Sequence, residues 1–180
     1  MTQLDAVVIE RARSIRVVLL DFDGVLTDGR IIQGSGGLDV RVFDVRDGMG
    51  IQLARAAGLD VGIVSGRTSR VLTDRAAELG IHEVHQGVGD KASCLGEIAG
   101  RLGAATNEIC FMGDDLIDLP AMRRAGFAAA PADAMPEVRK QAHYVTSRPG
   151  GRGAVRELVE VVLRASGRLD AVAAPYLRDA

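Results

Sequence analysis

Residues 17–29 have the sequence VVLLDFDGVLTDG, in which a short apolar run leads into two carboxylates separated by one residue. The run is apolar at every position rather than at alternate ones, which is typical of a strand covered on both faces in a parallel sheet. The glycine after the second carboxylate and the Thr-Asp-Gly turn end the strand. Asp21 and Asp23 are therefore expected at the carboxyl end of this strand, where open α/β sheets bind their ligands.

Two carboxylates so close together repel each other and lose hydration on burial, unless a cation or a shared proton compensates. Taken alone, the Asp-x-Asp pattern is better explained as a strand followed by an acidic turn. The functional interpretation of Asp21 and Asp23 therefore depends on what the rest of the chain brings to the same place.

The chain has 180 residues, enough for a sizeable core, and we expect a single domain over residues 1–180. The net charge is −2 without a basic stripe, and the aromatic content is 3%, so we expect no nucleic-acid partner. The apolar runs are too short to span a membrane, and the N-terminus lacks an apolar signal-peptide core. Cys94 and Cys110 fit no disulfide or metal spacing, so we expect a cytoplasmic protein with reduced thiols.

A β-hairpin is expected at about residues 29–44, from two alternating segments at 29–33 and 39–43 around a glycine-rich turn. This insert is too short to be a second domain. Its exposed apolar face would need a partner, which indicates an oligomer.

Beyond the hairpin, expected helices and strands alternate along the chain. This alternation predicts an α/β fold with a doubly wound, Rossmann-like parallel sheet and helices on both faces. Asp133 is expected to cap a helix that contains Pro136, and the tail at about 167–180 shows no convincing pattern. Helices are expected at 3–14 and 48–57, around Leu72 to Leu79 and Leu95 to Leu102, at 116–125 and around Val155 to Val162, and strands at 61–64, 81–86, 109–112, 127–130 and 142–145.

Polar residues of different kinds follow four of the expected strands: Asp21 and Asp23, then Ser65 and Gly66, then Lys91, then the acidic run Asp114, Asp115 and Asp118. Each has an ordinary explanation, as a helix cap, a solvated lysine or acids at a helix N-terminus. At one edge of one sheet, however, the acids suit Mg²⁺, which takes one or two carboxylates plus water and phosphate oxygens. The hydroxyl, the backbone amides and the lysine suit the remaining oxygens of a phosphoryl group, so the combination predicts phosphoryl transfer.

In this order, residues 21–25, Ser65, Lys91 and residues 113–118 resemble the four motifs of the haloacid dehalogenase superfamily, over about residues 15–165. The resemblance implies that Asp21 is a nucleophile forming an aspartyl-phosphate and that Asp23 is the general acid and base. It implies that Asp21, the Asp23 carbonyl and Asp114 hold Mg²⁺, with Asp118 acting directly or through water. Ser65, Gly66 and Lys91 would bind the phosphoryl group. An aspartate at position 23 favours a phosphatase over a dehalogenase.

The chain has no room for a cap domain, so it resembles the capless members of the superfamily. Residues 25–29, 45–51, 113–118 and 150–157 resemble the 3-deoxy-D-manno-octulosonate 8-phosphate phosphatase family. That resemblance implies a phosphorylated sugar-acid substrate and a homotetramer packed through its hairpins. Arg67, and Arg152 from the last loop, would bind the substrate carboxylate, or they could cap helices or pair on the surface. Arg67 favours the eight-carbon substrate over a nine-carbon 2-keto-sugar-acid 9-phosphate, which stays an alternative together with other small phosphate esters.

Two other hypotheses of function, from classes of protein other than phosphatases, must be weighed. A domain of this type can serve as a non-catalytic oligomerisation module, but such a module has no need of the clustered acids. A receiver-type signalling domain also places acids and a lysine around Mg²⁺, but it lacks the Asp21-x-Asp23 pair and orders its acidic strands differently. We therefore expect a phosphatase.

Overall fold

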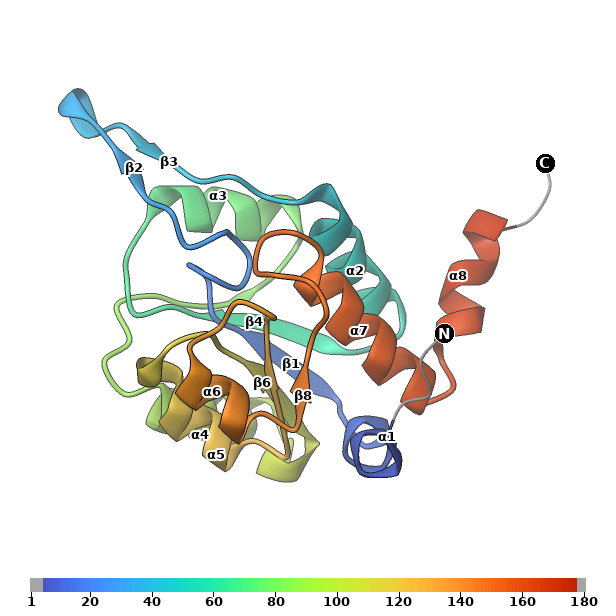
Figure 1. Ribbon diagram of the computed structural model, residues 1–180. Coiled ribbons are helices and arrows are strands. Elements are labelled where there is room, and N and C mark those ends of the chain that lie inside the picture. Colours follow the sequence, from blue (N-terminus) through green and yellow to red (C-terminus); the bar gives the residue numbers. More distant parts are fainter. Residues whose placement is uncertain (1–4, 178–180) are drawn as a thin grey trace.

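The computed structural model describes residues 5–177 and is built around a six-stranded parallel sheet (Figure 1). The strands lie in the order β5-β4-β1-β6-β7-β8. Leu20 of the central strand pairs with Ile63 on one side and with Met112 on the other, so neighbouring strands end level with one another. The strands are β1 (Val17–Leu20), β4 (Asp60–Val64), β5 (Glu83–His85), β6 (Ile109–Met112), β7 (Phe127–Ala130) and β8 (Tyr144–Val145).

Helices cover both faces of the sheet, which confirms the predicted doubly wound fold (Figure 1). Alternate residues of β1 point to opposite faces, so Val18 and Leu20 join one hydrophobic core and Val17 and Leu19 join the other. The first face carries α1 (Ala6–Arg13), α2 (Val45–Ala56), α3 (Arg70–Glu78) and α7 (Ala154–Ala165), and the second carries α4 (Lys91–Leu102), α5 (Leu119–Arg124) and α6 (Pro136–Gln141). Short 3₁₀ turns occupy Ser35–Gly37, Thr106–Glu108 and Leu116–Asp118.

Several helix starts differ from the expectation. Helix α1 begins at Ala6, and α5 begins at Leu119 because residues 116–118 form a 3₁₀ turn. Helix α2 begins three residues earlier than expected, because the Asp44 carboxylate accepts a hydrogen bond from the Arg46 backbone N–H at 2.8 Å. The prediction that Asp133 caps α6 is wrong, since Met135 occupies the cap position. Asp133 instead accepts a hydrogen bond from the Gly150 N–H at 2.9 Å, which ties the loop before α7 to the β7–α6 connection.

The hairpin is present but its ladder is short. Strands β2 (Ile32–Gln33) and β3 (Asp39–Val40) pair antiparallel through two residue pairs and project from the body of the molecule (Figure 1). The ladder stops at Val40 because the chain then turns inward, burying Arg41 and placing the Phe43 ring 5.9 Å from the Phe22 ring. Ile32 and Leu38 stay more than half exposed, so the hairpin has the uncovered apolar surface that the sequence indicates.

The C-terminal segment differs from the patternless tail that the sequence indicated. Residues Leu169–Leu177 form helix α8, which packs against α2 and α7, while residues 178–180 lie outside the described part of the chain. Leu169 and Val172 supply its apolar contacts with the core. Over residues 5–177, no helix is long and apolar enough to cross a membrane.

Candidate active site

A cavity of about 430 Å³ opens at the carboxyl edge of the sheet. It forms where β1, β4 and β6 end and the loops before α4 and α5 begin. Seven of the site residues predicted from the sequence line it, namely Asp21, Asp23, Ser65, Gly66, Arg67, Lys91 and Asp114. The register of the parallel strands therefore brings together side chains that are up to 93 positions apart in the sequence.

Lys91 lies at the base of the cavity between two carboxylates. Its Nζ donates to Asp21 Oδ1 and to Asp118 Oδ1, each at 2.6 Å, and its side chain is 1% exposed. Burial lowers the pKa of Lys91, but the carboxylates of Asp21 and Asp118 outweigh it and raise this pKa overall. Lys91 is thus a buried ammonium paired with two carboxylates rather than a solvated surface group.

Asp118 uses both carboxylate oxygens within the protein. Oδ1 accepts from Lys91, while Oδ2 accepts from the backbone N–H groups of Asp114 and Asp115 at 2.9 and 3.2 Å. Asp118 is fully buried at the end of the 3₁₀ turn, which Asp115 starts by accepting from the Leu116 N–H at 2.7 Å. This arrangement makes Asp118 an orienting group for the Asp114 backbone and for Lys91.

Asp114 adds a third carboxylate to the cluster. One oxygen each from Asp21, Asp114 and Asp118 lies within 4.8 Å of the others. Burial, together with the Asp118 carboxylate, raises the pKa of Asp21 to about 6, although Lys91 acts in the opposite direction. Burial and the carboxylates of Asp21 and Asp118 raise the pKa of Asp114 to about 8. Three carboxylates against one ammonium leave excess negative charge, and oxygen donors of this kind suit a hard divalent cation such as Mg²⁺.

Gly24 allows Asp114 to approach the turn after β1. Its φ of +98° lies in the left-handed region, and a Cβ at this position would lie 2.1 Å from Asp114 Oδ2. We expect Gly24→Ala to displace the Asp114 carboxylate and to lower catalytic efficiency by about 10²-fold, since a shift of about 1 Å in an active site has an effect of that order. Steady-state kinetics with a phosphate ester would measure the change.

Gly36→Ala is the matched control for this substitution. Gly36 also has a positive φ, of +73°, but a Cβ there meets no atom within 4 Å. Equal losses in the two variants would show that backbone strain, and not the position of Asp114, sets the effect of Gly24→Ala.

The loop after β4 presents Ser65, Gly66 and Arg67 to the cavity. Ser65 is 3% exposed, and its backbone N–H donates to the His85 carbonyl at 2.8 Å. Its hydroxyl accepts from the Arg67 N–H at 3.2 Å, which closes a tight turn. Because the N–H groups of Ser65 and Arg67 are used within the protein, the Ser65 hydroxyl and the Gly66 N–H are the donors that this turn offers to an anion.

Arg152 lies elsewhere. It lines a second cavity of about 370 Å³ together with Asp28, Arg46 and the chain that follows the hairpin. Its Nη2 is 3.8 Å from Asp28 Oδ2, and its side chain is 63% exposed. The structure therefore does not bring Arg152 into the cavity of Asp21, and its role in substrate binding stays a prediction.

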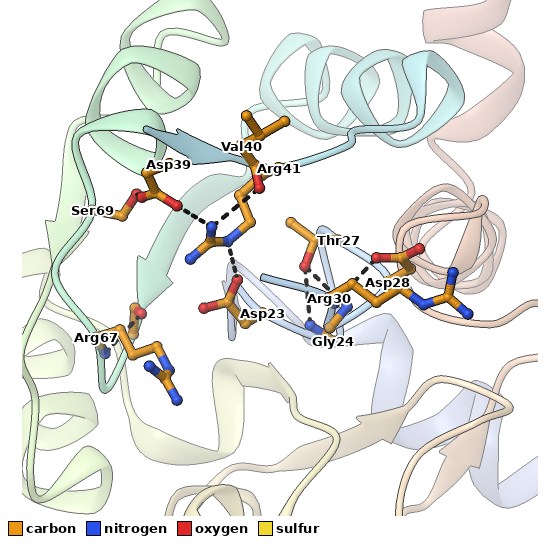
Figure 2. Close-up of polar contacts among 12 residues, drawn as sticks. Asp23, Gly24, Thr27, Asp28, Arg30, Asp39, Val40, Arg41, Arg67 and Ser69 are labelled. Atoms are coloured by element: carbon orange, nitrogen blue, oxygen red, sulfur yellow. Dashed lines mark hydrogen bonds and ion pairs between the residues drawn. The ribbon is translucent and has the colours of Figure 1, made fainter. Parts of the chain in front are cut away.

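Sequence reasoning missed Arg41, whose side chain is 2% exposed beside Asp23 (Figure 2). Its Nε donates to Asp23 Oδ1 at 2.8 Å. An arginine between two valines in an alternating segment has the pattern of the polar face of a strand, so no signal in the sequence indicated its burial.

Asp47 is a second residue whose position sequence reasoning did not explain. It is 1% exposed and accepts hydrogen bonds from the backbone N–H groups of Gly153 and Arg156 at 3.0 and 2.9 Å. Through these bonds α2 holds the loop before α7, and Gly150 in that loop touches the Gly24 carbonyl so closely that a Cβ would lie 1.8 Å from it. The start of α2 (residues 45–51) therefore contacts residues 150–157, and these in turn contact the turn that follows Asp23.

Comparison with known proteins agrees with this geometry. The sequence model of the haloacid dehalogenase-like hydrolases matches residues 78–158. The 3-deoxy-D-manno-octulosonate 8-phosphate phosphatase KdsC of Escherichia coli K12 is 42% identical over 167 residues, which are 93% of this chain and 89% of that protein.

Solved structures of such phosphatases superpose closely. The enzyme from Yersinia pestis has a TM-score of 0.91 at 42% identity, with 93% of this chain and 90% of that one covered. The enzyme from Moraxella catarrhalis, in complex with magnesium, phosphate and 3-deoxy-D-manno-octulosonate, has a TM-score of 0.91 at 37% identity, with 94% and 97% covered. The chain belongs to the 3-deoxy-D-manno-octulosonate 8-phosphate phosphatase family of haloacid dehalogenase-like hydrolases.

Proposed function

We propose that the protein is a Mg²⁺-dependent phosphatase that hydrolyses 3-deoxy-D-manno-octulosonate 8-phosphate to the free sugar acid and phosphate. The observation that carries the proposal is the buried cluster of Asp21, Lys91 and Asp118 with Asp114 beside it, in a chain 42% identical to an enzyme of that name. A purely structural module has no reason to bury two carboxylates around one ammonium with a third carboxylate beside them, since such burial is costly.

In the proposed reaction, an Asp21 carboxylate oxygen attacks the phosphorus atom, and the bond from phosphorus to the sugar oxygen breaks. Asp23 gives a proton to the departing alkoxide. The resulting Asp23 carboxylate then takes a proton from a water molecule, whose oxygen attacks the phosphorus of the aspartyl-phosphate. Phosphate is released and the Asp21 carboxylate is restored.

Asp21, the Asp23 carbonyl and Asp114 are the proposed Mg²⁺ ligands, and Asp118 would support the ion directly or through water. Mg²⁺ would neutralise the charge of the phosphoryl group so that a carboxylate can approach it. The magnesium and phosphate ions in the Moraxella catarrhalis enzyme support this assignment. Ser65, Gly66 and Lys91 are the proposed partners of the phosphoryl oxygens.

Arg67 is the proposed partner of the substrate carboxylate. It lines the same cavity as Asp21 and could grip a carboxylate with its planar fork of donors. Arg152 is the second candidate for this role. Because it lines the second cavity, it would contact the substrate carboxylate only if the substrate or a neighbouring subunit extended from the cavity of Asp21 to that of Arg152.

We also propose a cytoplasmic homotetramer that associates through the hairpins. The exposed Ile32 and Leu38 would supply apolar contacts there, and Cys94 and Cys110 are unpaired, as expected in a reducing compartment.

We expect Mg²⁺ to stabilise the protein more strongly at pH 8 than at pH 6. Folding raises the pKa of Asp21 to about 6 and that of Asp114 to about 8, from 3.8. Without a cation, the raised pKa values of these two acids contribute to the free energy of unfolding. This stabilisation is complete below pH 3.8 and is lost as the pH rises through the raised pKa values. Mg²⁺ competes with fewer protons at pH 8, where saturation at 100 times the dissociation constant adds about 2.7 kcal/mol.

Thermal unfolding with Mg²⁺ or EDTA at both pH values measures this effect. The shift in Tm between Mg²⁺ and EDTA is taken at each pH, so that the titration of remote groups cancels within each pair. The Asp114→Asn variant should lose most of the shift. A shift of equal size at both pH values would contradict the assignment of the cation to these acids.

The substrate assignment is tested by phosphate release from a small panel of esters, with Mg²⁺ or EDTA. The panel contains the eight-carbon acid 8-phosphate, nine-carbon 2-keto-sugar-acid 9-phosphates and hexose phosphates. We expect a strong preference for the eight-carbon acid that is lost on chelation and weakened in Arg67→Met. Preference for a nine-carbon acid would change the assigned substrate to that acid. If no ester released phosphate, the hypothesis of a non-catalytic oligomerisation module would be favoured.

A further inference from the structure

Arg41 has a buried guanidinium at the base of an otherwise exposed hairpin. Its Nε donates to Asp23 Oδ1 at 2.8 Å, and its Nη1 donates to the Val40 carbonyl at 3.2 Å and to Asp39 Oδ1 (Figure 2). The neighbouring Val42 is 63% exposed, whereas the Arg41 side chain is 2% exposed. Burying a charge at this depth is costly unless it is paired, and here two of the three acceptors are carboxylates.

The two oxygens of Asp23 have different surroundings. Oδ1 accepts from Arg41, while Oδ2 is buried and has no hydrogen-bond partner among the described residues. An arginine Nε can only donate, so Oδ1 must stay an acceptor. A proton carried by Asp23 therefore resides on Oδ2, which points away from Arg41 (Figure 2).

The same arginine has a second carboxylate partner besides Asp23. Asp39 balances its charge, and Asp39 Oδ2 in turn accepts from the Ser69 hydroxyl at 2.9 Å. Ser69 occupies the N-cap position of α3, four residues after Ser65. The guanidinium is thus anchored to the hairpin and to the helix that follows the turn of Ser65, and these contacts fix its Nε beside Asp23 Oδ1.

We infer that Arg41 is the positioning residue of the general acid and base: it holds Asp23 Oδ1 so that Oδ2 gives the proton to the leaving alkoxide and later takes the proton of the attacking water. The inference rests on the proposed phosphatase function. Arg41 itself does not line the cavity and has no contact with the substrate in this role.

The test compares two esters that differ in their need for an acid. p-Nitrophenolate leaves phosphorus without a proton, whereas phenolate and the sugar alkoxide are much poorer leaving groups and need one. The quantity to measure is kcat/KM, because it includes only the steps up to release of the alcohol and omits hydrolysis of the aspartyl-phosphate. The wild type, Arg41→Met, Arg41→Lys and Arg30→Met would be compared with Mg²⁺.

In Arg41→Met we expect kcat/KM to fall by about 10²-fold for phenyl phosphate and for the sugar-acid phosphate, which is the lower end of a general-acid contribution. For p-nitrophenyl phosphate it should change by less than about threefold. Hydrolysis of the aspartyl-phosphate still needs the base, so p-nitrophenol should appear in an initial burst of about one equivalent per enzyme. Arg41→Lys keeps the charge and should recover part of the loss.

Arg30→Met is the matched control, since Arg30 belongs to the same segment, is exposed and does not line the cavity. Equal losses for both phenyl esters in Arg41→Met would mean a general structural role and would overturn the inference. If Arg41→Met fails to fold, Arg41→Lys supplies the same ratio, and an unchanged ratio there would overturn it as well. A folded wild type that hydrolyses none of the esters would instead overturn the proposed function, and the inference with it.

Discussion

Asp21→Asn is expected to abolish phosphate release, lowering kcat by at least about 10⁴-fold, because an amide cannot act as the nucleophile. The substitution keeps the shape of the side chain. It also removes a buried carboxylate whose pKa is raised by burial, so the free energy of unfolding without Mg²⁺ should not fall. Phosphate-release kinetics and thermal unfolding would measure the two effects.

Asp28→Asn is the control for Asp21→Asn. Asp28 belongs to the same turn region but lines the second cavity. Turnover close to that of the wild type in Asp21→Asn would exclude the covalent route, and equal inactivation of both variants would point to disruption of the turn.

Lys91→Met is expected to impair both stability and catalysis. The substitution leaves Asp21 and the fully buried Asp118 without their shared ammonium, and breaking a buried pair from one side typically lowers the free energy of unfolding by about 3–5 kcal/mol. The variant also loses a cation that would stabilise the transferring phosphoryl group, so kcat should fall by about 10²- to 10³-fold. Denaturant unfolding and steady-state kinetics measure the two losses separately.

Lys140→Met serves as the control because Lys140 is the chain's other lysine and is exposed on α6. A Lys91→Met variant as stable as Lys140→Met would contradict the charged bridge between Asp21 and Asp118.

The strands could be predicted well where burial alone determines them. Strands β6 and β7 have the bounds expected from the sequence, and all eight of their residues are buried. A continuous apolar run covered on both faces carries its signal in its own composition. The same signal places the site residues: Asp21 and Ser65 come directly after such a run, Asp114 follows one residue later, and Lys91 opens the next helix.

Features that depend on distant partners could not be predicted. Helix α8 contains Pro175 and gains its apolar contacts from α2 and α7, so its own sequence gives a weak pattern. The hairpin ladder ends early because Phe43 packs against Phe22. The burial of Arg41 likewise depends on its ion pair with Asp23. The hydrogen bond from Lys91 to Asp118 also joins residues that are far apart in the sequence.

The central claim is that Asp21 takes the phosphoryl group from the substrate, and it can be observed directly in Asp23→Asn. With p-nitrophenyl phosphate and Mg²⁺, the first step needs no acid, whereas hydrolysis of the intermediate lacks its base. Mass spectrometry of the quenched protein is expected to find one phosphoryl group on the peptide that contains Asp21, and none when Asp21→Asn is added. Release of p-nitrophenol without that modification, or with the phosphoryl group on another residue, would contradict the claim.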